Sequence, residues 1–186
     1  MKRFIISLVA FVALATTSFA QEDNMPKVDS SPLDMAYYQT KMDNKTMNYA
    51  RVIYSRPQVK GREIFGKLVP YGKVWRTGAN EATEVQFYQD VMIAGVTLEA
   101  GTYELFTVPG EKEWTIIFSN TSSSWGAYNY KEESDLAIKL SAPTRKTNTK
   151  FEYFSIYFTE TDGPGQATMN MAWDNTLVSV PLKFEM

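Results

Sequence analysis

The feature that most constrains the fold is an alternation of apolar and polar residues, which recurs in short runs from residue 48 onwards. Four clear runs span residues 136–140, 154–158, 167–173 and 178–184. A period of two residues indicates β-strands, and parallel strands would need crossover helices, for which no long amphipathic pattern is present. The sequence therefore predicts an all-β domain, an antiparallel two-sheet sandwich or flattened barrel of about eight to ten strands.

The first twenty residues differ from the rest of the chain. Two basic residues precede an apolar run over residues 4–15, and Ser18 and Ala20 supply small side chains where a signal peptidase cleaves. We expect residues 1–20 to be a signal peptide and the mature chain, from Gln21, to be periplasmic or secreted. An uncleaved anchor helix is the alternative. Because no cysteine follows the cleavage site, a lipoprotein is not expected, and no later apolar run suits a membrane span.

The segment that follows has no clear strand pattern, and we expect residues 21–47 to be a tether. Within it, Ser31 and Pro32 followed by Asp34 are typical of the first turn of a helix, which predicts one short helix there. The remainder, residues 48–186, is expected to form a single β-sandwich domain, because its length suits one domain.

The absence of cysteine and histidine narrows the chemistry that is open to the chain. It excludes a thiol nucleophile, a Ser-His-Asp triad, an imidazole base and a zinc site of the ordinary ligand type. No metal and no cofactor are expected, and a non-catalytic role is favoured. The chain has 19 basic and 21 acidic side chains, and cleavage would remove two of the basic ones, so nucleic acid is not an expected partner. The sequence does not indicate an oligomeric state.

Residues 54–83 form a long basic connection in which Pro and Gly recur too densely for a long helix or strand. Such a segment inside a compact domain usually has a function. Guanidinium groups bind carboxylates, phosphates or sulfates through two hydrogen bonds, and exposed aromatic rings stack on sugars. We therefore expect a site on this loop face for a small anionic or carbohydrate ligand. The expected ligand-binding residues are Arg56, Arg62, Trp75, Arg76, Asn80, Glu81 and Trp125.

Two other interpretations remain open. In the first, the chain is a carboxylate-based hydrolase, similar to a glycosidase, with Glu81 as base or nucleophile and a second acid across a cleft. The candidates for this second acid are Glu84, Asp90 and Glu104. In the second, the chain is a structural envelope protein and the connection is an internal polar clasp, in which Arg62 and Arg76 bond loop carbonyls and pair with Glu63 and Glu81. If the protein is not an enzyme, no catalytic residue is expected.

The tryptophans are expected to divide between core and surface. Trp114 and Trp173 lie in alternating runs, which favours the core, whereas Trp125 follows a serine-rich loop and is expected to be exposed. Ala94-Gly95 has the length of a hairpin turn, although alanine disfavours the left-handed conformation that such turns require.

The segment YSRPQVKGREIFGKLVPYGKVWRTGANEAT, followed by AGTYELFTVPG, EWTIIFSN, WGAY and AWDNTLVSVPL, resembles a family of exported bacterial domains of unknown function. The likeness covers about residues 31–182 and implies an exported, all-β, single-domain protein with no assigned activity. The matching positions are Arg56, Pro57, Gly61, Arg62, Trp75, Arg76, Thr77, Gly78, Asn80, Glu81 and Thr83. Ala94-Gly95 departs from the expected pattern, which puts the local hairpin in doubt and not the family.

Overall fold

The computed structural model describes residues 26–42 and 44–185. The expected signal peptide, residues 1–20, lies outside the described residues. Within the described part of the chain, no helix is long and apolar enough to cross a membrane.

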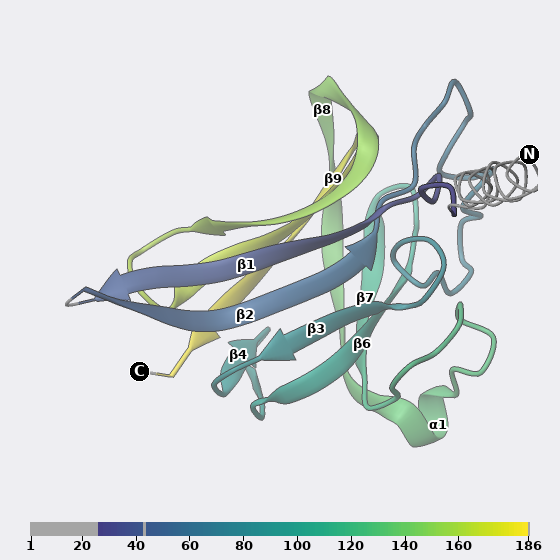
Figure 1. Ribbon diagram of the computed structural model, residues 1–186. Coiled ribbons are helices and arrows are strands. Elements are labelled where there is room, and N and C mark those ends of the chain that lie inside the picture. The colour runs from purple at the N-terminus through teal and green to yellow at the C-terminus, as the bar shows by residue number, and fades with distance from the viewer. Residues whose placement is uncertain (1–25, 43, 186) are drawn as a thin grey trace, which may run out of the picture.

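The described chain forms nine strands and one helix of four residues (Figure 1). The strands are β1 (Leu33–Met42), β2 (Lys45–Ser55), β3 (Thr83–Phe87), β4 (Val91–Ile93), β5 (Val96–Leu98), β6 (Gly101–Val108), β7 (Glu113–Ser119), β8 (Leu136–Glu160) and β9 (Gln166–Phe184). The helix α1 (Glu132–Asp135) precedes β8. The prediction of an all-β fold is confirmed.

All nine strands belong to one antiparallel sheet, in the order β1-β2-β3-β6-β7-β8-β9-β4-β5. The 25-residue strand β8 joins its two halves, because its first part pairs with β7 and its second part with β9. In Figure 1, β8 and β9 curve behind β1 and β2. Since β1 and β5 are separate edges, the sheet is not closed into a barrel. The two layers expected of a sandwich are therefore two halves of one open sheet.

Aromatic side chains fill the space between these halves. Near one end, Phe184 of β9 contacts Tyr38, Tyr49 and Phe87, with ring centroids 5.7, 5.3 and 6.0 Å away. Near the other end, Trp173 of β9 contacts a group of aromatic residues from the connection and from β8. Strands β1, β2 and β3 are thus packed against β9 through these rings.

The expected tether with a short helix is wrong for the residues that form β1. Leu33–Met42 pairs with β2 along its length. Tyr38 and Thr40 are buried, whereas Met35 and Tyr37 point outwards and are exposed. This alternation has a period of two, and burial of Tyr38 against the core outweighs the helix-start signal at Ser31, because local signals at a chain segment are weak compared with packing.

The hairpin at Ala94-Gly95 forms despite its turn residues. Ile93 pairs with Val96, and Ala94 and Gly95 have φ angles of 51° and 83°. Two successive left-handed residues match the twist of a two-residue hairpin. Ala94 adopts this conformation at a cost of about 1–2 kcal/mol.

Candidate functional site

The connection between β2 and β3, residues 56–82, is held against the end of the sheet by buried anchors and main-chain hydrogen bonds. Ile64 and Val69 are buried, and the Val69 amide donates to the Ile64 carbonyl at 2.9 Å. Trp75 and Thr107 of β6 exchange main-chain hydrogen bonds of 2.7 and 2.9 Å. The irregular segment is therefore ordered, with defined directions for its side chains.

A cleft of about 580 Å³ opens between this connection and the end of the sheet. Its apolar part includes Trp75 and Trp173, whose rings stack with centroids 5.9 Å apart and an angle of 16° between their planes. Its positively charged lining residues are Lys60, Arg62, Lys73 and Arg76. No aspartate or glutamate is among the described residues that line it. The cleft is therefore positively charged inside a protein whose overall charge is negative.

The four cations of the cleft have no ion-pair partner within the described ranges, whereas pairs occur elsewhere in the chain. Arg62 is partly engaged, since its Nε donates to the Val59 carbonyl at 3.1 Å and its Nη2 donates to the Gln58 carbonyl. This contact agrees with part of the clasp interpretation. The pairing of Arg76 with Glu81 that the clasp also requires is not among the ion pairs of residues 26–42 and 44–185.

Two buried N–H groups of the lining residues have no acceptor among the described atoms. They are Nε1 of Trp173, a side chain that is only 1% exposed, and Nε of Arg76. By contrast, Nε1 of Trp75 donates to the Gly78 carbonyl at 3.0 Å. Leaving a buried donor without an acceptor costs about 1–3 kcal/mol. The described lining of the cleft therefore has positive charge that no lining carboxylate balances, which suits an oxygen-rich anion.

Asn80 is hydrogen-bonded to the segment that precedes β1, and together they form one side of the cleft. Its Nδ2 donates to Oδ1 of Asp29 at 3.2 Å, and Asp29 also accepts a hydrogen bond from the Ser31 amide at 2.6 Å. The bond from Ser31, and then that from Asn80, lower the pKa of the Asp29 carboxyl group below its ordinary value. Asp29 thus stays ionised and fixes Ser30 and Ser31 as part of the cleft wall.

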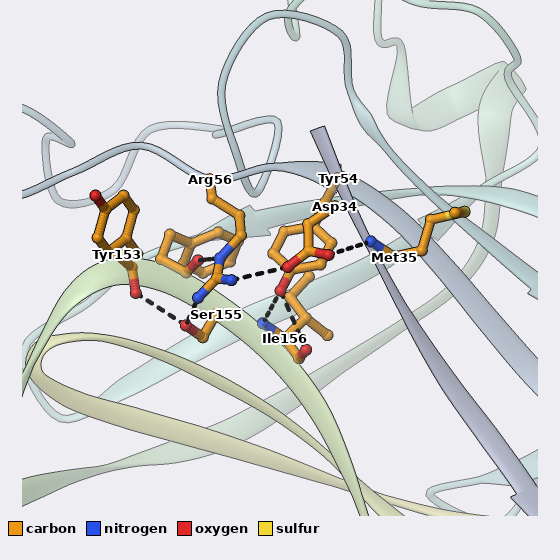
Figure 2. A network of polar contacts seen from close by, with 8 residues as sticks. Asp34, Met35, Tyr54, Arg56, Tyr153, Ser155 and Ile156 are labelled. Carbon is orange, nitrogen blue, oxygen red and sulfur yellow. Dashed lines mark hydrogen bonds and ion pairs between the residues drawn. The ribbon is translucent and has the colours of Figure 1, made fainter. Parts of the chain in front are cut away.

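Arg56, which the sequence also assigns to the site, lies outside the cleft lining, and each of its three guanidinium nitrogens donates a hydrogen bond (Figure 2). Its guanidinium group donates to Asp34 of β1 at 2.8 Å, to the Phe154 carbonyl at 3.1 Å and to the Ser155 hydroxyl at 2.8 Å. It also lies over the Tyr153 ring, 5.6 Å from the centroid. Arg56 therefore connects β1 and β8 to the end of β2.

Glu81 and Trp125 lie beside the cleft and do not line it. They form an isolated antiparallel bridge, Glu81 is exposed, and Trp125 is 63% exposed, as expected from its position in the sequence. Glu81 lines a smaller cavity of about 230 Å³ with Glu84 and Glu104, so the fold does place these three residues around one cavity. Asp90 is not in that lining.

Glu104 has a defined structural role. It is 3% exposed, and its carboxylate accepts hydrogen bonds from the Thr121 hydroxyl and, at 2.6 Å, from the Ser124 amide. Both oxygens are thus engaged in holding the loop between β7 and α1. Among the described residues, no group of three acidic side chains is arranged to hold a metal ion.

The structure thus brings together four of the seven expected site residues: Arg62, Trp75, Arg76 and Asn80. Three further residues that were not expected at the site also line the cleft, Lys60, Lys73 and Trp173. The count of basic residues in the connection could have indicated the two lysines. Nothing in the local pattern distinguishes Trp173 from an ordinary core residue.

Fold and site together define a class, an all-β domain built from one open sheet with a positively charged cleft at one end. The chain belongs to the family described as Protein of unknown function (DUF2911), whose model matches residues 31–182. Comparisons with curated proteins and with solved structures gave no match.

Proposed function

We propose that this chain is a non-catalytic binding domain, whose cleft takes a small oxygen-rich anion such as a carboxylate, a phosphate ester or an acidic sugar. The observation that carries this proposal is the charge imbalance of the cleft, whose described lining residues include four cations and no carboxylate. Two of these residues, Arg76 and Trp173, also have a buried N–H group without an acceptor among the described atoms. Cations that line a concave site raise the local concentration of an anion and bind it there.

The place of action is the periplasm or the exterior of a bacterial cell. This part of the proposal depends on the first twenty residues, which have the charged start, apolar run and small residues of a signal peptide. Lys60 and Lys73 are exposed at the cleft, where solutes of that compartment reach them.

Two observations support binding over the rival functions. A hydrolase that uses Glu81 would need its acid pair at a substrate cleft, whereas the larger cleft has no described carboxylate in its lining and Glu104 is held by the loop after β7. A purely structural clasp would engage Arg76, whose Nε has no acceptor among the described groups.

The test is calorimetric titration of the purified protein at low salt with citrate, glucuronate, phosphate and neutral glucose. We expect saturable binding of at least one anion, no binding of glucose, and weaker binding at high salt because the contacts are ionic. Arg76→Ala should weaken binding at least about tenfold, which corresponds to one lost charge-assisted contact.

Arg145→Ala is the matched control, because it removes the same charge from an exposed position on β8, outside the cleft. It should bind the anion as the wild type does. If no anion binds, or if Arg76→Ala binds as tightly as the wild type, the proposed function is wrong.

A further inference from the structure

Two large aromatic side chains are exposed on the loop that precedes α1. Trp125 is 63% exposed and Tyr128 is 82% exposed, and we call this pair the aromatic platform. Single exposed aromatic residues are common, but two of them on one ordered loop beside a charged cleft suggest a binding surface. In Figure 1 this loop and the connection between β2 and β3 both lie at the right of the sheet.

The platform loop is fixed in place. Its Ser124 carbonyl accepts a hydrogen bond from the Ala82 amide at 2.9 Å, and its Ser124 amide donates to the buried carboxylate of Glu104 at 2.6 Å. Trp125 bridges to Glu81. A rigid loop presents its rings without a large loss of conformational entropy when a ligand binds.

The platform is continuous with the cleft through Arg76. Gly126 has a φ angle of 77°, and a Cβ atom at this position would lie 3.4 Å from Nη1 of Arg76 and 2.6 Å from the Tyr128 ring. The positive φ angle and the close Tyr128 ring therefore require glycine here, and the loop lies next to Arg76. A ligand that contacts Arg76 in the cleft therefore lies near Gly126, the chain neighbour of Trp125.

The charge differs in sign between the cleft and the aromatic platform. The cleft has four cations, whereas the exposed Glu81 carboxylate lies beside the platform, without an ion-pair partner in the described part of the chain. A ligand unit on the platform should therefore be neutral, and hydroxyl groups could donate to Glu81. A sugar ring fits these conditions, because its C–H face stacks on aromatic rings and its hydroxyls donate hydrogen bonds.

We propose that the ligand is a short glycan with one acidic sugar in the cleft and a neutral sugar on the aromatic platform, where a hydroxyl of the neutral sugar donates to Glu81. This inference rests on the proposed function of the cleft. A nucleotide would also offer a phosphate and a flat ring, but a chain of nucleotides carries a negative charge on each unit and would be repelled by Glu81.

The experiment compares calorimetric titrations with glucuronic acid, a disaccharide of glucuronic acid and a neutral hexose, a disaccharide of two uronic acids, and uridine monophosphate. The mixed disaccharide should bind about tenfold more tightly than glucuronic acid, because stacking is added. Trp125→Ala should remove this gain and leave the affinity for glucuronic acid unchanged. Glu81→Gln should reduce the preference for the mixed disaccharide over the diuronic one.

Tyr157→Ala removes an exposed aromatic ring from β8 and serves as the control, which should keep the full gain. Tyr128→Ala provides a second test should Trp125→Ala lose its fold, which its melting temperature would reveal. If the wild type binds glucuronic acid and the mixed disaccharide equally tightly, the aromatic platform does not bind a sugar. The same conclusion follows if only uridine monophosphate binds more tightly than glucuronic acid. If other anions bind but neither glucuronic acid nor the mixed disaccharide does, the ligand is not a glycan and the proposal of an anion-binding cleft is retained. If no anion binds, the proposed function itself is wrong.

Discussion

Arg56 and Arg76 belong to the same basic connection, yet their surroundings are opposite. Arg56 donates to Asp34, Phe154 and Ser155, and it joins two distant strands (Figure 2). Arg76 lines the cleft, and its buried Nε has no acceptor among the described residues. Satisfied polar groups stabilise a fold, whereas unsatisfied ones reduce stability and are retained when they serve a function. The contrast separates an arginine that holds the fold together from one that, under the proposed function, contacts the ligand.

The largest effect that tests this comparison is expected for Arg56→Ala. The variant should lose about 3 kcal/mol of unfolding free energy, because three hydrogen bonds from a charged group disappear at a partly exposed position. Urea unfolding of the variant and the wild type measures this difference.

Arg76→Ala is the matched variant, since it removes the same group from the same connection. Its unfolding free energy should stay within about 0.5 kcal/mol of the wild type, or rise. A loss of about 3 kcal/mol in Arg76→Ala would instead indicate a structural clasp and would remove the contrast.

The acidic residues beside the cleft allow a second comparison, with a smaller effect. Glu104→Gln should lose about 2 kcal/mol, because an amide cannot accept from both Thr121 and Ser124 as the carboxylate does. Glu81→Gln should change the stability by less than about 0.5 kcal/mol, since Glu81 is exposed. Urea unfolding gives both values, and similar losses in the two variants would contradict the distinction between them.

The smallest expected effect is the pH dependence of the unfolding free energy that comes from Tyr38. This residue lies in β1, the strand that also holds Asp34, the partner of Arg56. Burial, and then the negative charge of Glu160, raise the pKa of Tyr38 from 10.0 to about 12. The unfolded chain thus loses this proton at a lower pH than the folded chain, so the folded state becomes less stable as the pH rises above about 10. Between pH 9 and pH 11 the unfolding free energy should fall by about 1 kcal/mol from Tyr38.

Urea unfolding across this pH range, with Tyr38→Phe as the control, isolates the contribution of Tyr38. Burial also raises the pKa of four other tyrosines, whose contributions have the same sign: Tyr54, Tyr71, Tyr103 and Tyr130. The slope for Tyr38→Phe should therefore be smaller than that of the wild type, but not zero. An equal slope in both proteins would rule out Tyr38 as a source of the alkaline instability.

The fold class could be predicted because burial on one face of a strand leaves a period of two in the sequence. The same rule applies to β1, but Ser31 and Pro32 supply a helix-start signal that hides the alternation around Tyr38. It could not be predicted that residues 136–160 form one continuous strand, β8. Residues 141–153 are largely polar and exposed, so they interrupt the apolar pattern of this strand. A strand that turns from one layer to the other faces solvent at its bend.

The cleft could be predicted in part for a related reason. The charge of residues 54–83 is a local property, so the basic connection is visible in the sequence. The difference between Arg56 and Arg76 depends on Asp34 and Ser155, which are distant in sequence and meet Arg56 only in the folded sheet. The same holds for Trp173, which joins the cleft from β9.

The contacts of Phe184 also bear on the order of events during protein synthesis. Phe184 of β9 packs against Tyr38, Tyr49 and Phe87, which the ribosome produces much earlier. The first three strands can pair as they emerge, but their aromatic faces stay in contact with water until β9 is complete. Closure of the core should therefore follow translation of β9 and be slow, because its contacts join residues far apart in the chain. Until then the exposed aromatic faces make the incomplete chain prone to aggregation.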